Sequence, residues 1–205
     1  MGLPGRRGAP VDWLIVGLGN PGAEYAGTRH NAGFQIAEAL AARWQLPKAK
    51  ARYRGVLREG RAGTDGPRVA ILLPQTHMND AGDSVGPARG ALRVELDRVL
   101  VLHDEIDLPF GEIRVRTGGG LAGHNGLKSV KQGVGGVGFV RVRAGVGRPP
   151  STDPDRVAAY VLSRFREPRE EVEAMIERAA DATEQLLRAP PPATGPPGQS
   201  PQRPT

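Results

Sequence analysis

The chain has 205 residues and no cysteine, which excludes disulfide bonds and thiolate metal sites. No apolar run approaches the roughly 18 residues of a membrane span, and the first ten residues lack the apolar region of a signal peptide, so we expect a cytoplasmic protein with no membrane partner. The net charge of +6 falls to +3 for residues 11–188, because Arg6, Arg7 and Arg203 lie in Gly/Pro-rich ends, and this surplus alone does not indicate a nucleic-acid partner.

In chain order, the first half of the sequence alternates apolar runs with polar turns. Short apolar or alternating runs predict strands at 12–18, 53–58, 68–73 and 98–103. A helical spacing of apolar residues predicts a helix at 32–44 and a weaker one at 84–92. Asn31 directly precedes the first of these helices, so its side-chain oxygen is expected to cap the free amides of the first turn.

The second half contains further strands and helices around a glycine-rich loop at 118–126. Strands are predicted at 113–116 and 139–146, and helices at 127–132, 154–162 and 168–188. Alternating strands and helices predict an α/β fold, a single-domain three-layer sandwich with a twisted, mostly parallel mixed sheet flanked by helices. This domain is expected to span 11–188, between a disordered extension at 1–10 and a proline-rich, disordered tail at 189–205.

The connection between the first strand and the first helix is long and chemically rich, which predicts an active-site wall. It reads G-L-G-N-P-G-A-E-Y-A-G-T-R-H-N-A-G-F over 17–34, and its start matches the G-x-G-x-x-G pattern of dinucleotide-binding proteins, so a nucleotide-dependent oxidoreductase is one alternative. That pattern requires a helix to open at the last glycine, whereas Pro21 precedes Gly22 here and apolar periodicity begins only near Ala32. A tight turn that presents Asn20 fits the residues better.

A histidine and an aspartate form the predicted catalytic pair. His30 stands at the amino end of a helix, whose dipole disfavours the imidazolium, and a general base must be neutral near pH 7. Asp104 ends a buried strand at the ligand-binding edge of the sheet, where it could fix an imidazole tautomer. The chain has no serine or cysteine nucleophile elbow and no histidine pair at metal-ligand spacing. We therefore predict water attack with no metal or cofactor, while His77 and His103 are more typical of structural histidines.

Several residues around the glycine-rich loop have two open interpretations. His124 and Asn125 lie where glycines let a substrate approach the backbone, but they are equally compatible with a structural role. Arg116 and Arg143 lie on alternating strands, and Lys128 on the helix after the loop. Exposed strand faces often carry arginine, but if these cations converge, their geometry suits a phosphate.

Five ordered motifs resemble those of the bacterial peptidyl-tRNA hydrolase family. They are G-L-G-N-P-G-x-E-Y-x-x-T-R-H-N-x-G at 17–33, T-x-M-N-x-x-G at 76–82, H-D-E-I-D-L-P-x-G-x-I-R at 103–114, G-G-G-x-x-G-H-N-G-L-K-S at 118–129 and R-V-R-x-G-V-G-R-P at 141–149. The resemblance extends over about 14–165. It implies a monomeric α/β enzyme that, without a cofactor, cleaves the ester between an N-blocked peptide and the 3′ ribose of tRNA.

The resemblance also implies roles for the residues that match the family motifs. His30 would be the general base, and Asp104 would orient it. Asn125 would position the water or the oxyanion, while Asn20 and Asn79 would hold the peptide-bearing end.

Other matching positions would bind the rest of the substrate. Tyr25 and Met78 would shape the cleft, and His124 would line the loop that faces the tRNA. Arg116 and Arg143 correspond to the family's basic clamp for the tRNA 5′-phosphate, so the expected partner is the acceptor arm of peptidyl-tRNA.

The sequence departs from the family pattern at three places. His77 replaces the aromatic residue usual before Met-Asn, which would make the cleft more polar, and Glu105 replaces the commoner aspartate after Asp104. A short family segment expected after Arg188 is replaced by the proline-rich tail, so we expect weaker substrate retention with the chemistry intact. A catalytically weakened tRNA- or RNA-binding protein on the same fold therefore stays open as an alternative.

Overall fold

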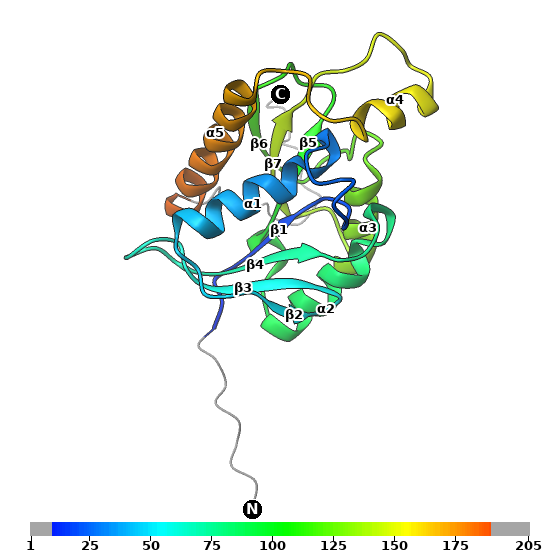
Figure 1. Ribbon diagram of the computed structural model, residues 1–205. Helices are drawn as coiled ribbons and strands as arrows, with labels where there is room; N and C mark the ends of the chain where they lie inside the picture. The colour runs from blue at the N-terminus through cyan, green and yellow to red at the C-terminus, as the bar shows by residue number, and fades with distance from the viewer. Residues whose placement is uncertain (1–9, 190–205) are drawn as a thin grey trace, which may run out of the picture.

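A computed structural model of the chain describes residues 10–189, which fold around one sheet of seven strands (Figure 1). The strands are β1 (Trp13–Gly17), β2 (Lys50–Arg52), β3 (Gly55–Arg61), β4 (Arg68–Pro74), β5 (Val99–Glu105), β6 (Ile113–Thr117) and β7 (Val140–Gly145). Their order across the sheet is β2-β3-β4-β1-β5-β7-β6. The central strands β4, β1, β5 and β7 run parallel, whereas β2, β3 and β6 pair antiparallel toward the edges. The predicted mixed sheet is confirmed.

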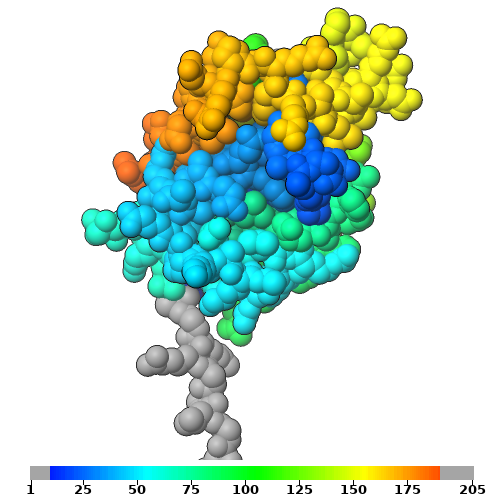
Figure 2. Space-filling view, in the orientation of Figure 1, coloured from blue at the N-terminus to red at the C-terminus, as the bar shows by residue number. Residues whose placement is uncertain are grey.

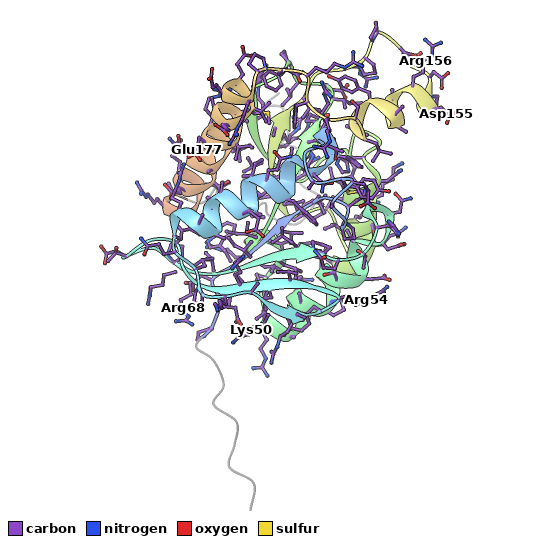
Figure 3. The ribbon with its side chains drawn as sticks, in the orientation of Figure 1. Lys50, Arg54, Arg68, Asp155, Arg156 and Glu177 are labelled. Atoms are coloured by element: carbon purple, nitrogen blue, oxygen red, sulfur yellow. The ribbon has the colours of Figure 1, made fainter. Side chains whose placement is uncertain are left out.

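Helices cover both faces of this sheet and complete the predicted three layers. They are α1 (Ala32–Arg43), α2 (Gly82–Leu92), α3 (Asn125–Val134), α4 (Pro154–Val161) and α5 (Arg169–Arg188), with 3₁₀ turns η1 (Arg29–Asn31), η2 (Met78–Asp80) and η3 (Leu96–Arg98). One face carries α1 and α5, and the other carries α2 and α3 (Figure 1). Helix α4 buries none of its residues and projects from the body in Figure 2, and its Asp155 and Arg156 point outward in Figure 3.

The central strands are apolar along their whole length because both of their faces are covered. In β1, Trp13 and Ile15 pack into the core beneath α1 and α5, while Leu14 and Val16 pack into the core beneath α2 and α3. All of these side chains are at most 1% exposed. The central strands are therefore packed on both faces, and this packing fixes the position of the polar residues at their carboxyl ends.

Two glycines allow α1 to approach β1 and β5 more closely than side chains would permit. A Cβ atom on Gly33 would meet the carbonyl oxygen of Leu102 and would lie 2.6 Å from the backbone nitrogen of Leu18, and one on Gly17 would lie 2.6 Å from the carbonyl oxygen of Gly33. The amide of Phe34 also donates to the carbonyl oxygen of Leu18 at 3.1 Å. This close contact fixes the start of α1, and with it η1, against the carboxyl end of the sheet.

One predicted strand is wrong at its amino end. The sequence predicts a strand at 53–58, but Tyr53 and Arg54 form a tight turn with φ of +53° and +52°. The short strand β2, which the sequence analysis missed, precedes this turn and pairs with β3 as an antiparallel hairpin. Neither residue type favours positive φ, so nothing in the composition of this segment predicts the turn.

The predictions of disorder at 1–10 and 189–205 lie outside the described residues, except for Pro10 and Ala189. The segment after Arg188, from which weaker substrate retention is expected, also lies outside the described residues apart from Ala189. Within the described part of the chain, no helix combines the length and apolar character needed to cross a membrane.

We expect Gly33→Ala to lower the free energy of unfolding by roughly 3 kcal/mol or more, because the added methyl group meets backbone atoms that cannot move aside. Gly90→Ala is the matched control, since Gly90 is exposed in α2 and a Cβ there has nothing within 4 Å. This control should raise stability by roughly 0.5–1 kcal/mol through helix propensity. Chemical denaturation of both variants measures the difference, and equal stabilities would contradict the close-contact argument.

Candidate active site

The carboxyl ends of β1, β4 and β5 open into a cavity of about 690 Å³. Asn20 and His30 come from the connection after β1, Met78 and Asn79 from η2 after β4, and Asp104 from the end of β5. The loop before α3 and one face of α4 complete the wall. This is the edge of a parallel sheet at which α/β proteins place their ligands.

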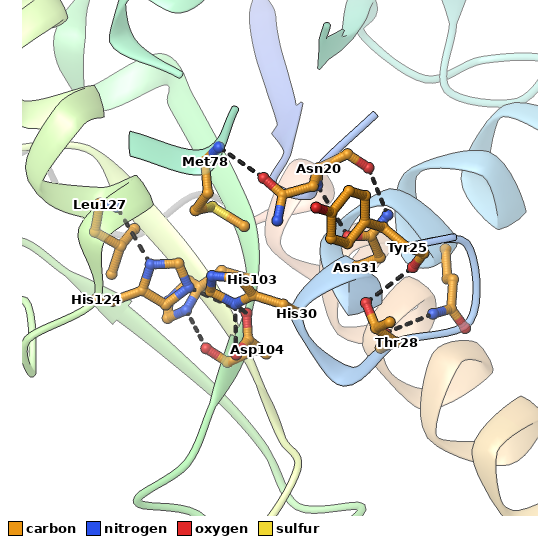
Figure 4. Close-up of polar contacts among 11 residues, drawn as sticks. Asn20, Tyr25, Thr28, His30, Asn31, Met78, His103, Asp104, His124 and Leu127 are labelled. Atoms are coloured by element: carbon orange, nitrogen blue, oxygen red, sulfur yellow. Dashed lines mark hydrogen bonds and ion pairs between the residues drawn. The ribbon is translucent and has the colours of Figure 1, made fainter. Parts of the chain in front are cut away.

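Two histidines share the carboxylate of Asp104 (Figure 4). Nδ1 of His30 lies 3.0 Å from Oδ1 and 3.2 Å from Oδ2, while Nε2 of His124 lies 3.1 Å from Oδ1. Because a carboxylate accepts hydrogen bonds, we assign both of these ring nitrogens as N–H donors. The backbone amide of Leu127 donates to Nδ1 of His124 at 3.4 Å, which agrees with that assignment. Nε2 of neutral His30 then carries a lone pair.

The carboxylate of Asp104 is charged in spite of its burial. Only 2% of Asp104 is exposed, and this burial raises its pKa. Attraction to His30 and His124, which are positively charged when protonated, and the hydrogen bonds from both rings outweigh burial and hold the pKa of Asp104 well below its usual range. A carboxylate that stays ionised can stabilise positive charge that develops on the His30 ring.

A third histidine, His103, contacts both His124 and the backbone of Asp104. The ring of His103 is fully buried and stands edge-on to that of His124, with ring centroids 5.1 Å apart and an interplanar angle of 82°. Nδ1 of His103 donates to the backbone carbonyl oxygen of Asp104 at 2.6 Å. Burial, followed by the charge of His124, lowers the pKa of His103 to about 3, so its imidazole is neutral near pH 7. His103 does not line the cavity, which agrees with the predicted structural role.

Asn20 is held in a frame of three hydrogen bonds. The backbone amide of Asn20 donates to Oδ1 of Asn31, and its backbone carbonyl oxygen accepts from Nδ2 of Asn31, both at 2.9 Å. Its Oδ1 accepts from the amide of Met78 at 2.8 Å. Within residues 10–189, Nδ2 of Asn20 makes no protein hydrogen bond, so it can donate to a ligand. The predicted helix-capping role of Asn31 is wrong, because its side chain makes no capping bond and braces the Asn20 turn instead.

Arg29 connects the turn that carries His30 to α4 and the segment that follows it. This arginine is 3% exposed, and its guanidinium makes an ion pair with Glu167 at 3.0 Å and donates to Oγ of Ser163 at 3.0 Å. The guanidinium carbon Cζ of Arg29 also lies over the ring of Tyr160, 4.4 Å from the ring centroid. The sequence analysis missed this residue, because its partners lie more than 130 positions away.

Four arginines gather on one face of the β6–β7 edge, outside the cavity. The antiparallel pairing sets Arg114 opposite Arg143 and Arg116 opposite Arg141. Opposed residues and their neighbours two positions along a strand share one face of a sheet. Arg143 pairs with Glu105 at 3.0 Å, and Arg116 is exposed.

Arg141 is the buried member of this group, with 1% exposed. Its guanidinium donates to the carbonyl oxygen of Gly118. Burial, together with the charges of Arg143 and Arg116, lowers its pKa from the usual value. The structure therefore places Arg116 and Arg143 on the same face of the β6–β7 edge, with Arg141 as a third cation that the sequence analysis did not single out.

Comparisons with known proteins place this chain in a family. The sequence model described as peptidyl-tRNA hydrolase matches residues 14–194. The peptidyl-tRNA hydrolases of Syntrophotalea carbinolica and Geobacillus thermodenitrificans are both 46% identical to the chain, over 85% and 86% of its length and 90% and 94% of theirs. The crystal structure of peptidyl-tRNA hydrolase from Acinetobacter baumannii superposes with a TM-score of 0.75 at 39% identity, covering 88% of this chain and 91% of that one.

The chain belongs to the peptidyl-tRNA hydrolase family. The seven predicted site residues that line its cavity are Asn20, His30, Met78, Asn79, Asp104, His124 and Asn125. Four others lie outside it. Tyr25 and Lys128 do not line the cavity, although Nζ of Lys128 lies 3.4 Å from Oδ1 of Asn125, and Arg116 and Arg143 lie at the β6–β7 edge.

The two departures from the family pattern that fall on described residues have different surroundings. His77 is exposed and lines the cavity, which agrees with a more polar cleft. Glu105 is 4% exposed, and its carboxylate accepts from Arg143 and from the amide of Asp107. This residue therefore connects the end of β5 to the cluster of arginines.

The buried His103 predicts how stability depends on pH. Its pKa is about 3 in the folded protein, against 6.5 for the free side chain, so the unfolded chain binds more protons between these values. Stability should therefore fall as pH is lowered through this window, with a contribution of about 1.4 kcal/mol per pH unit. Asp104, whose pKa is depressed, adds its own loss only at lower pH, below its ordinary value of 3.8.

Urea denaturation of wild type and His103→Asn between pH 6.5 and 4 tests this linkage. The unfolding free energy of the variant should vary less with pH than that of wild type, whatever its absolute stability. Parallel pH profiles for the two proteins would show that His103 titrates normally.

Proposed function

We propose that this chain hydrolyses the ester bond between an N-blocked peptide and the 3′ ribose of tRNA, releasing peptide and free tRNA. The observation that carries the proposal is the His30–Asp104 pair, whose free Nε2 lies in a cavity next to asparagine amides. Relatives at 46% identity carry the name of this activity. Because peptidyl-tRNA is formed during translation, the activity belongs in the cytoplasm.

In the proposed reaction, Nε2 of His30 takes a proton from a water molecule whose oxygen attacks the ester carbonyl carbon. Asp104 stabilises the resulting imidazolium. The amides of Asn20 and Asn125 would donate to the oxyanion or hold the water. When the tetrahedral intermediate collapses, the ribose oxygen leaves and receives the proton from His30, so the base returns to its neutral form.

The rest of the cavity suits the peptide end of such a substrate. Asn79 is exposed on the wall and offers an amide to peptide backbone groups, while buried Met78 supplies apolar surface next to Asn20. We assign a contact role to Tyr25 as well, at the rim rather than in the cavity. Backbone recognition of this kind would accept peptides of any sequence.

The arginine cluster at the β6–β7 edge supports a separate site for the acceptor arm. Arg116 and Arg143 would hold the tRNA 5′-phosphate, Arg141 would add positive charge beneath them, and Lys128 would contact the backbone nearby. His124 would lie between the two sites, because its loop runs from this edge to the cavity.

The site residues all come from one chain, so we propose that the enzyme acts as a monomer. The alternative of a tRNA-binding protein with weakened catalysis is less favoured. A chain that no longer hydrolysed its substrate would have no need to retain the His30–Asp104 pair and the braced Asn20.

Release of N-acetyl-amino acid from N-acetyl-aminoacyl-tRNA tests the activity directly. His30→Ala should lower kcat at least roughly 10²-fold, because the water loses its base. The unblocked aminoacyl-tRNA is the substrate control and should be cleaved slowly by wild type. Salt-sensitive tRNA binding by a wild-type protein that cleaves neither substrate would favour the RNA-binding alternative.

Arg116→Gln tests the phosphate site. We expect KM to rise about tenfold with little change in kcat, since a charge-assisted contact to substrate is lost away from the chemistry. The rise should vanish with tRNA that carries a 5′-hydroxyl. Lys50→Gln removes the same charge from the exposed strand β2, at the opposite edge of the sheet (Figure 3), and should leave KM unchanged. Equal effects of the two substitutions would indicate only a general loss of positive charge.

A further inference from the structure

The His–Asp–His cluster at the base of the cavity has the composition of a metal site. His30, Asp104 and His124 each offer one ligand atom, and these atoms lie within 4.8 Å of one another. Within residues 10–189, they form the one group of three histidine or carboxylate side chains that is arranged in this way. We propose that this cluster binds a single Zn²⁺ ion and that the bound ion switches off the hydrolase. The binding part stands on geometry alone, and only the inhibition rests on the proposed function.

The distances between the ligand atoms come close to those of a zinc site. Zinc binds imidazole nitrogen and carboxylate oxygen at about 2.0–2.2 Å, so ligand atoms in a tetrahedral site lie about 3.4 Å apart. The two hydrogen-bonded pairs, His30 with Asp104 and Asp104 with His124, are 3.0 and 3.1 Å apart. The third pair, Nδ1 of His30 and Nε2 of His124, lies within 4.8 Å, so shifts of the two ring nitrogens by up to about an ångström would bring all three ligand atoms to the zinc spacing.

The position of the cluster leaves room for a fourth ligand. All three residues line the cavity, so one coordination position faces open space that water can fill. Three protein ligands with one position left for water are the arrangement of catalytic zinc sites, whereas closed structural sites use four protein ligands. The backbone carbonyl of Asp104 is held by Nδ1 of His103, which steadies the central ligand from outside the cluster.

Zinc would inhibit by changing the tautomer of His30. In the metal-free site, Nδ1–H of His30 donates to Asp104 and Nε2 is the free base. When zinc takes the Nδ1 lone pair, the ring proton must move to Nε2, and the ring remains neutral. His124 makes the opposite change, from Nε2–H to Nδ1–H, and gives up the bond from the amide of Leu127. No net proton is released, but the nitrogen that faces the substrate water becomes a donor, so it cannot remove a proton.

Calorimetric titration of the tRNA-free protein with ZnCl₂ tests the binding. We expect one site per chain, and a loss of at least about tenfold in affinity for His124→Gln, because one of three ligands is gone. His30→Gln should lose affinity in the same way. Because His30 is more exposed than His124, this variant serves as a second test if His124→Gln does not fold. His77→Gln is the matched control, since His77 lines the same cavity outside the cluster and its loss should leave zinc affinity unchanged.

The activity arm uses N-acetyl-aminoacyl-tRNA with zinc, with magnesium as the control ion, and with chelator added afterward. Zinc should abolish wild-type hydrolysis, chelator should restore it, and magnesium should do neither. The residual activity of His124→Gln should resist zinc. Absence of stoichiometric binding, or binding that depends on His77 instead, overturns the site. If the chain proves to have no hydrolase activity, calorimetry alone still decides whether the cluster binds zinc.

Discussion

A buried negative charge governs the active site. The carboxylate of Asp104 is almost completely removed from water at the end of the central strand β5, and an ionised group in such a place is stable only when donors surround it. Two imidazole N–H groups from different connections of the chain meet that need. Each of them comes from a connection that must be held in position, so the structure around the site can be understood as support for these two donors.

The support for His30 is the more elaborate of the two. The glycine contact between α1 and the sheet brings η1 to the end of β5, and the paired hydrogen bonds between Asn20 and Asn31 hold the preceding turn against it. Arg29 anchors the other side through Glu167. His124 needs less support, because it directly precedes α3 and packs edge-on against buried His103. His30 is therefore placed by contacts between distant segments, whereas His124 is placed mainly by α3.

The sequence could predict the parts of this arrangement that depend on local pattern. The central strands show as apolar runs, and His30 and Asp104 could be paired because one opens a helix and the other ends a buried strand. The sharing of Asp104 with His124, the bracing role of Asn31 and the burial of Arg29 could not be predicted, since each depends on contacts between residues far apart in the chain. The Tyr53–Arg54 turn was missed for a different reason, because positive φ at these residue types leaves no compositional trace.

The alternation of side chains along β5 separates the two halves of the proposed substrate. Asp104 and Glu105 are neighbours in the chain, but neighbouring residues of a strand point to opposite faces of the sheet. Asp104 therefore reaches His30, while Glu105 reaches Arg143 in the arginine cluster. Since Glu105 neutralises one cation of that cluster, a bound 5′-phosphate would have to compete with it or rely on Arg116 and Arg141. In the proposed enzyme, Glu105 would therefore influence phosphate binding through Arg143 without a hydrogen bond to His30, although it also lines part of the cavity.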